Sequence, residues 1–147
     1  MVAHLYTEEF ARLIMKRGKK HKARKHIHAA IKYTQQTEGS RKSAEEILQE
    51  GVRKVQPMFG SRKQSIAGRT YAIPVLLSPK KQVNTAIRWM HAAALSNTYP
   101  YGAKLRFTKA LSQQIVYALN KQGEAFRKKQ RYNAFAQSNK DLLRYKL

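Results

Sequence analysis

The sequence contains no cysteine, only eight acidic residues and no long hydrophobic run. Without cysteine, the chain has no disulfide, no Cys-ligated zinc site and no thiol nucleophile. The longest apolar run, Ile73 to Leu77, contains Pro74 and is far shorter than the roughly 18 residues of a membrane-spanning helix, so we expect no membrane partner. Residues 1–25 are basic, as in a transit peptide, but Glu8 and Glu9 fit that interpretation poorly. We assign these residues to the mature domain.

The few acidic residues also argue against catalysis. They are scattered along the chain, and no pair of them stands out for acid–base chemistry. The sequence has neither a Walker phosphate-binding loop nor a G-x-G-x-x-G motif. His26 and His28 are two residues apart, which on a helix places them on different faces, so we expect them to face RNA or solvent rather than a metal ion. We therefore predict no enzyme activity, no cofactor, no metal site and no small-molecule substrate.

Positive charge is what the sequence has in excess. Its 30 lysines and arginines give a formal net charge of +22 over 147 residues. The length favours a single domain over residues 1–147, and a hydrophobic content of 42% is enough for a core. Such a charge opposes compaction through self-repulsion unless a polyanion neutralises it. The composition thus predicts a partner rich in phosphate.

Helical periodicity predominates in the first third of the chain. We expect a first helix capped by Thr7 and ended by Gly18, and a second over residues 20–37. A third helix opens with the capping box of residues 43–46 and closes at Pro57. The expected buried face of the second helix consists of Ala23, Ile27, Ala30, Ile31 and Thr34.

The pattern then changes from helix to strand and back. Residues 58–77 are rich in strand formers and predict a β-hairpin with its tip around residues 65–69. Ser78-Pro79 is typical of a helix start, which predicts a fourth helix. A fifth helix ends at Gly123, and a sixth covers about residues 125–140. The predicted fold is mainly α: a six-helix bundle with a β-hairpin ribbon inserted between the third and fourth helices.

The cations gather in clusters. Seven lie between residues 16 and 25, where solvated surfaces would normally mix the two signs, yet no acid occurs between Glu9 and Glu38. We interpret this cluster as a phosphate-binding patch. Its members are Lys16, Arg17, Lys19, Lys20, Lys22, Arg24 and Lys25. Further clusters are Arg62, Lys63 and Arg69 on the ribbon, Lys80, Lys81 and Arg88 on the fourth helix, and Arg127, Lys128, Lys129 and Arg131 on the last helix.

This distribution favours folded RNA as the partner. Charge spread over helices, a ribbon and a basic tail (about residues 141–147) suits a protein embedded in RNA, whereas a DNA reader usually concentrates it on one recognition element. A DNA-binding or architectural protein remains the alternative, and an RNA-acting enzyme is opposed by the scarcity of acids. Tyr132 and Tyr145 either stack on unpaired bases or pack against helices, and we expect Trp89 at the core or its edge.

Four segments, in order along the chain, resemble the family of small-subunit ribosomal protein seven. They are residues 10–30 with Met15-Lys16-Arg17-Gly18-Lys19-Lys20, Val55-Gln56-Pro57 followed by Gly68-Arg69-Thr70-Tyr71-Ala72-Ile73-Pro74, Ala86-Ile87-Arg88-Trp89, and Arg127-Lys128-Lys129 with Ser138-Asn139-Lys140. The resemblance implies a structural constituent of the small ribosomal subunit that binds the 3′ major (head) domain of its RNA and helps to nucleate head assembly. It also implies neighbouring head and platform proteins, and a ribbon near the exit-site tRNA and the mRNA path. The RNA contacts that it implies are Lys19, Lys20, Lys22, Arg24, Arg62, Lys63, Arg69, Lys80, Lys81, Arg88, Arg127, Lys128 and Lys129.

The chain departs from the family pattern in several places. His26-Ile27 stands where the family has an apolar pair, and Gln130 and Arg131 stand where bacterial members carry acids. The loop 96–102 is longer than usual, and the basic leader of bacterial members is missing. Together with the many tyrosines, these departures favour a mitochondrial ribosome over a bacterial or plastid one.

Overall fold

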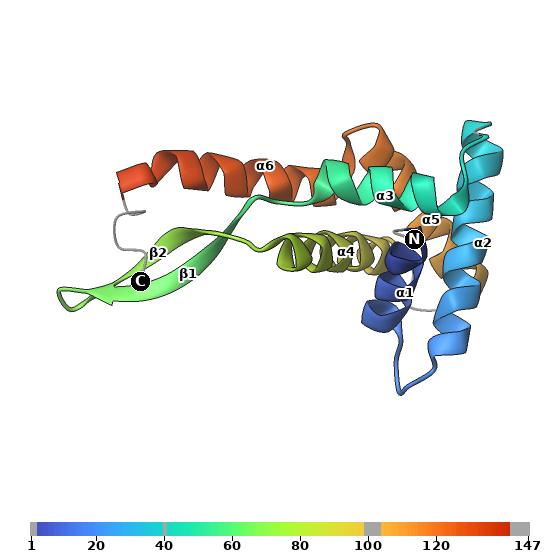
Figure 1. Cartoon of the computed structure of the whole chain (residues 1–147), viewed down its shortest axis with the longest axis horizontal. Coiled ribbons are helices and arrows are strands. Elements are labelled where there is room, and N and C mark those ends of the chain that lie inside the picture. Colours follow the sequence, from blue (N-terminus) through green and yellow to red (C-terminus); the bar gives the residue numbers. More distant parts are fainter. Residues whose placement is uncertain (1–2, 40, 99–103, 142–147) are drawn as a thin grey trace.

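The computed structural model describes residues 3–39, 41–98 and 104–141. In order, the elements are α1 (Ala3–Ile14), α2 (Lys20–Glu38), α3 (Ala44–Val55), β1 (Phe59–Ile66), β2 (Arg69–Leu76), α4 (Pro79–Ser96), α5 (Lys104–Leu119) and α6 (Gly123–Ser138). The predicted mainly α fold, with a hairpin between the third and fourth helices, is confirmed. Helices α1, α2, α3 and α5 form a body, and the ribbon and α6 extend away from it as an arm (Figure 1). No helix in these ranges is both long and apolar enough to cross a membrane.

The core lies where the first five helices meet. The predicted inward face of α2 is confirmed, since Ala23, Ile27, Ala30, Ile31 and Thr34 are all buried. Phe10 of α1, Leu48 of α3, Ile87 of α4 and Leu111 of α5 are at most 1% exposed and belong to the same cluster as Ile27. Each such side chain stabilises the fold by about 1.5–3 kcal/mol through its removal from water.

The start of the first helix differs from the prediction. Helix α1 already begins at Ala3, so Thr7 lies inside it and is not its N-cap. Its buried hydroxyl donates a hydrogen bond to the carboxylate of Glu45 on α3. The sequence pattern was misleading because a threonine hydroxyl can be satisfied by a neighbouring helix as well as by a helix terminus. The capping box of α3 is confirmed: the Glu46 amide donates to Ser43 Oγ at 3.3 Å, and the Ser43 amide donates to Glu46 Oε2 at 3.0 Å.

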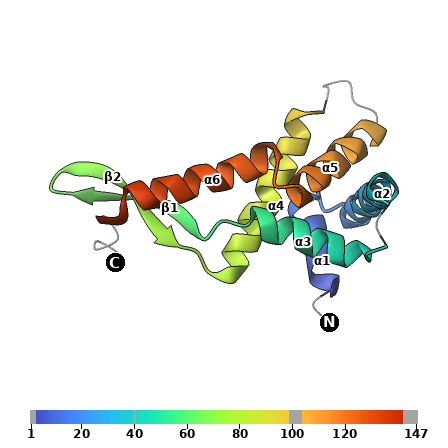
Figure 2. The ribbon, with the colours of Figure 1, turned by 90° about the horizontal axis from the view of Figure 1, so that it is seen from above.

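The ribbon follows the predicted course. Strands β1 and β2 are antiparallel, with Phe59 opposite Leu76 at the base and Ile66 opposite Arg69 at the tip. Ala67 and Gly68 form the turn with φ of 50° and 79°, the positive values of a two-residue hairpin turn. Helix α6 contacts both strands and runs beside the ribbon, as Figure 2 shows from above. The arm is therefore a two-stranded ribbon supported by one helix.

Hydrogen bonds hold the base of the ribbon to the helices on either side. The Leu77 amide donates to the Met58 carbonyl at 3.0 Å, and Gln82 Nε2 of α4 donates to the Leu77 carbonyl at 2.9 Å. Gln56 Nε2, just after α3, donates to Gln82 Oε1 at 3.2 Å. Gln82 thus fixes the direction in which the ribbon leaves the body.

The turn between α5 and α6 also differs from the prediction. Helix α5 ends at Leu119, and Gly123 is the first residue of α6 rather than the end of α5. Lys121 (φ 54°) reverses the chain, and the Gln122 amide donates to the Tyr117 carbonyl at 2.7 Å. Gly123 has a φ of 90°, and a Cβ there would lie 3.0 Å from Tyr117 Cβ. Glycine is therefore needed at this position both for its backbone angle and for space.

We predict that Gly123→Ala lowers the free energy of unfolding by more than the about 1–2 kcal/mol that a left-handed conformation costs an alanine, because the side chain of Tyr117 must also move. Gly39→Ala is the matched control: Gly39 also has a positive φ, but nothing lies within 4 Å of the added Cβ. Urea unfolding followed by circular dichroism measures both. An equal loss in the two variants would contradict the steric part of the argument.

Candidate nucleic-acid interface

The seven cations of residues 16–25 surround the connection between α1 and α2. We call them the loop patch: Lys16, Arg17, Lys19, Lys20, Lys22, Arg24 and Lys25. Five of them are exposed, while Lys20 and Arg24 are partly covered. Arg17 and Gly18 turn the chain with φ of 55° and 71°, and Lys19 is the N-cap of α2. The positive end of the α2 dipole therefore lies among these side chains and adds to their attraction for an anion.

One acid of α1 reaches into the loop patch. Glu8 pairs with Lys20 Nζ at 2.8 Å and with Arg24 Nη2 at 2.6 Å. The hydrogen bond from Lys20, which has the largest effect, and the one from Arg24 lower the pKa of Glu8 from its usual 4.5 to about 2. Glu8 thus joins α1 to α2. Two of the seven cations thus have a protein partner, which a phosphate would have to replace or share.

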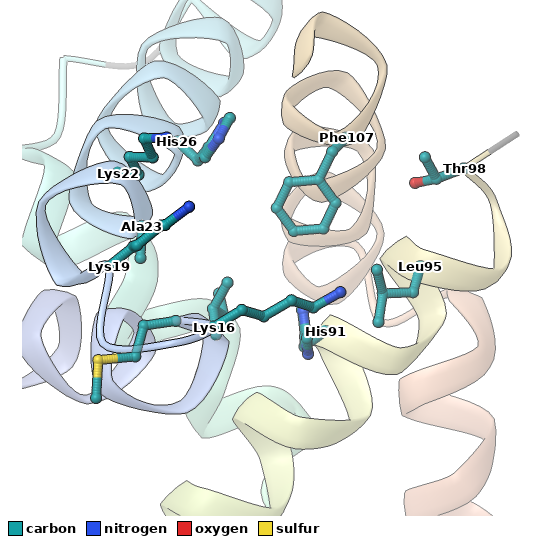
Figure 3. A pocket seen from close by; sticks show the side chains of 11 residues that line it. Lys16, Lys19, Lys22, Ala23, His26, His91, Leu95, Thr98 and Phe107 are labelled. Atoms are coloured by element: carbon teal, nitrogen blue, oxygen red, sulfur yellow. The ribbon is translucent and has the colours of Figure 1, made fainter. Parts of the chain in front are cut away.

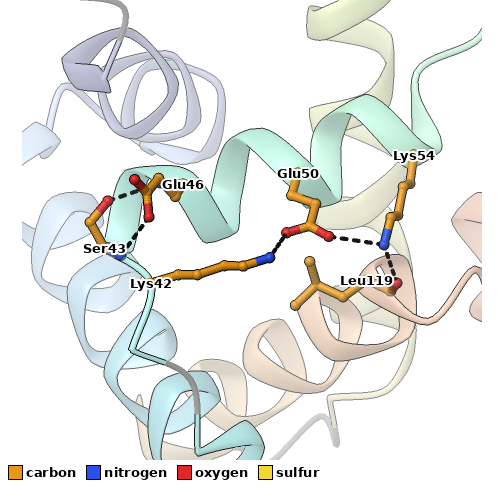
Figure 4. A network of polar contacts seen from close by, with 6 residues as sticks. All are labelled: Lys42, Ser43, Glu46, Glu50, Lys54 and Leu119. Carbon is orange, nitrogen blue, oxygen red and sulfur yellow. Dashed lines mark hydrogen bonds and ion pairs between the residues drawn. The ribbon is translucent and has the colours of Figure 1, made fainter.

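Acids collect on a different part of the body. Glu38, Glu45, Glu46 and Glu50 are four of the eight acids, and they lie at the end of α2 and on α3. Glu50 pairs with Lys42 at 2.6 Å and with Lys54 at 3.1 Å, and Lys54 Nζ also donates to the Leu119 carbonyl at 2.7 Å (Figure 4). The hydrogen bond from Lys42, which has the largest effect, and the one from Lys54 lower the pKa of Glu50. This surface mixes the two signs and is a poor match for a polyanion.

Two of the other predicted clusters lie on the ribbon and on α4. Arg62, Lys63 and Arg69 are exposed on the ribbon, which extends from the opposite end of the molecule (Figure 1). Exposed Lys80 and Lys81 occupy the first turn of α4, and exposed Arg88 lies about two turns further along that helix. The structure thus presents exposed cations on the α1–α2 connection, on α4 and on the ribbon.

The cations of α6 divide into two groups. Arg127 and Arg131 are exposed and share Glu124, at 4.0 and 3.3 Å. Lys129 instead donates to the Lys54 carbonyl at 3.0 Å, and its Nζ lies 5.9 Å from the centre of the Phe126 ring. Burial lowers the pKa of Lys129. The ammonium group of Lys129 therefore attaches α6 to α3. Lys128 is half-buried, and in the described part of the chain it makes no comparable hydrogen bond.

An aromatic pair joins α4 to α6. The rings of Trp89 and Tyr132 are 5.3 Å apart at an interplanar angle of 32°, and Trp89 in turn contacts the core. The prediction of Trp89 at the edge of the core is confirmed. Of the two alternatives for Tyr132, base stacking or packing against a helix, the structure shows packing against α4. Tyr145 and tail residues 142–147 lie outside the described residues.

A pocket of about 350 Å³ lies beside the loop patch, and sequence reasoning missed it. Its walls come from the α1–α2 connection, α2, α4 and α5, so that Lys16, Lys19 and Lys22 meet His91 and Phe107 there (Figure 3). Burial, assisted by the charge of Lys16, lowers the pKa of His91. Within the described ranges, no three histidine or acidic side chains are close enough to hold a metal ion.

We predict that Glu8 makes stability depend on pH in the acidic range. Since the pKa of Glu8 is lowered in the folded state, its ion pairs stabilise the fold above about pH 4.5, and this contribution is lost as the pH falls through about 2. Wild-type protein should therefore lose more stability between pH 6 and pH 2 than Glu8→Gln in urea titrations. Glu9→Gln removes an equal charge that pairs only with Arg12 of the same helix, and it should behave like wild type. Identical pH profiles for wild type and Glu8→Gln would contradict this role.

Comparison with known proteins is consistent with this arrangement. The family model described as "Ribosomal protein S7p/S5e" matches residues 2–140. The small ribosomal subunit protein uS7c of Bigelowiella natans is 33% identical over 132 residues, covering 90% of this chain and 80% of that protein. The uS7 protein of Nitratiruptor sp. is 28% identical over 138 residues, with 94% and 85% covered, and uS7c of Prototheca wickerhamii is 30% identical over 134 residues, with 90% and 81% covered. The chain belongs to the ribosomal protein S7p/S5e family.

Proposed function

We propose that this protein is a structural component of the small ribosomal subunit that binds ribosomal RNA through the loop patch and has no enzymatic role. The observation that carries the proposal is the separation of charge on the body. Seven cations surround the α1–α2 connection with Glu8 as their acidic partner, while half of all acids lie on α3 and the end of α2. The names of the relatives, small ribosomal subunit proteins, support the same role.

The finer parts of the proposal assign a role to each group of exposed cations. The loop patch binds the 3′ major domain of the small-subunit RNA and helps to nucleate the head, with Arg88, Lys80 and Lys81 as a second contact. The ribbon, with Arg62, Lys63 and Arg69, lies near the exit-site tRNA and the mRNA path. The mixed-charge surface of α3 suits neighbouring head or platform proteins better than RNA. The mitochondrial location stays a prediction, because the relatives are uS7c proteins and bacterial uS7 proteins.

The first test removes charge from the loop patch without touching the pocket. In Arg17→Gln with Lys25→Gln, we expect the slope of log affinity against log salt to become shallower by about 1.4–1.8, since each lost phosphate contact contributes about 0.7–0.9. The measurement is a filter-binding titration of the full chain with a transcript of a bacterial 3′ major domain. The control is Arg41→Gln with Arg53→Gln, which removes two exposed cations beside and on the acidic α3 surface.

This experiment also separates RNA from DNA as the partner. A control variant that changes the slope as much as the loop-patch variant would contradict the assignment of this surface. Duplex DNA that competes as well as the RNA transcript would favour the architectural DNA-binding alternative, because folded RNA offers loops and shapes that duplex DNA lacks.

The second test concerns the ribbon. We expect Lys63→Gln with Arg69→Gln to assemble into small subunits at wild-type level but to retain exit-site tRNA less well, because these two charges lie on the arm and not on the body. Sucrose-gradient sedimentation measures assembly, and filter binding of deacylated tRNA to purified ribosomes measures retention. Gln64→Ala, which changes an uncharged residue next to Lys63 on β1, is the control. Failed assembly, or wild-type tRNA retention by the assembled variant ribosomes, would contradict the division of roles between arm and body.

A further inference from the structure

We propose that the pocket beside the loop patch accepts one unpaired nucleobase of the bound RNA. The inference rests on the proposed RNA-binding function and adds to it a specific site for a base, in addition to the phosphate contacts of the patch. Figure 3 shows the cavity between α2, α4 and α5, with lysines on one side and the Phe107 ring reaching into it.

The inner surface of the pocket is suited to a flat ring. Phe107 projects from α5 between two imidazoles, His26 of α2 and His91 of α4. Its ring centre lies 5.8 Å from that of His26 and 5.9 Å from that of His91, with interplanar angles of 87° and 85°. Both contacts are therefore of the edge-to-face kind, and the part of the Phe107 ring that lines the cavity is the surface on which a base would stack.

Apolar and polar groups complete the site. Ala23 and Leu95 supply aliphatic surface on two sides of the cavity. The polar groups at the site include the imidazole of His91, and His26 Nδ1 lies 3.2 Å from Thr108 Oγ1, which orients the His26 ring. A nucleobase has an apolar face and a polar edge, which matches this combination.

The charge around the pocket indicates a nucleotide rather than an uncharged molecule. Lys16, Lys19 and Lys22 line the pocket, and none of the described lining residues is acidic. The Lys16 side chain extends toward His91, and its charge contributes to the lowered pKa of that histidine. A base that leaves the RNA stack carries a phosphate on either side, and these cations are placed to meet them.

The size of the pocket favours a single base. At about 350 Å³, it lies near the lower end of the range of about 300–1,000 Å³ that is typical of small-ligand pockets. A phosphate ion alone would use the lysines and leave the Phe107 face empty. Only a ligand that combines an aromatic ring with phosphate uses both parts of the site.

The test compares two RNA hairpins of equal charge. Both have a short stem, but one carries a single bulged adenosine and the other an abasic bulge at the same position. We expect the full wild-type chain to bind the adenosine hairpin at least about fivefold more tightly, the lower end of what one base–aromatic stack contributes. Phe107→Leu should remove this preference, and Phe107→Trp should retain it. Because none of these variants changes the charge, the salt dependence should stay the same in all of them.

Two further measurements locate the base and exclude a folding effect. The imidazole proton resonances of His26 and His91 should shift on addition of the adenosine hairpin and much less with the abasic one. Phe135→Leu makes the same substitution on α6, outside the pocket, and should keep the preference. Equal binding of the two hairpins by wild-type protein would overturn the pocket assignment while leaving the loop patch intact. Absence of salt-dependent binding to either hairpin would instead contradict the proposed RNA-binding function.

Discussion

Mutual repulsion among the cations is the constraint around which this structure is arranged. A net charge of +22 on 147 residues works against compaction, and only eight acids are available to offset it. Three of these acids each pair with two cations: Glu8 with Lys20 and Arg24, Glu50 with Lys42 and Lys54, and Glu124 with Arg127 and Arg131. Their placement leaves much of the loop patch unneutralised. The apolar core of the first five helices must hold the body together against this repulsion.

Local signals in the sequence were enough to predict most of the fold. The inward face of α2, the capping box of α3 and the hairpin turn each depend on residues close together in the chain. The two errors have different causes. Thr7 binds Glu45 across 38 positions rather than capping its own helix, and such a contact has no signature within a single window of sequence. Tyr117 is only six positions from Gly123, but a glycine with positive φ fits the start of α6 as well as the end of α5, so the residue type alone does not place the helix boundary.

The same division applies to the candidate site. Clusters of cations are visible in the sequence, and the structure places most of them on the surface, as expected. Their individual surroundings are not visible there. Lys129 is charged like Lys128 but donates to the Lys54 carbonyl, and Glu8 reaches Lys20 only because α1 and α2 run side by side. The pocket needs α4 and α5 to bring His91 and Phe107 to a loop about 70 to 90 residues earlier in the chain, a juxtaposition that only the folded structure reveals.

Lys54 connects three helices at the point where the arm leaves the body. Its ammonium group reaches the end of α5 at the Leu119 carbonyl, and its own carbonyl accepts a hydrogen bond from Lys129 of α6. The rings of Tyr132 and Trp89 pack against each other and tie α6 to α4 about one turn further along. Lys129 and Tyr132 both lie near the middle of α6, so these contacts hold the helix close to its centre. The nine residues of α6 beyond Lys129 span about 14 Å, so a tilt of about 10° at these contacts would move the end of the helix by roughly 2 Å. Because α6 also contacts both strands, residues of α3 and α4 help to set the direction of the ribbon, far from the surface that the ribbon itself presents.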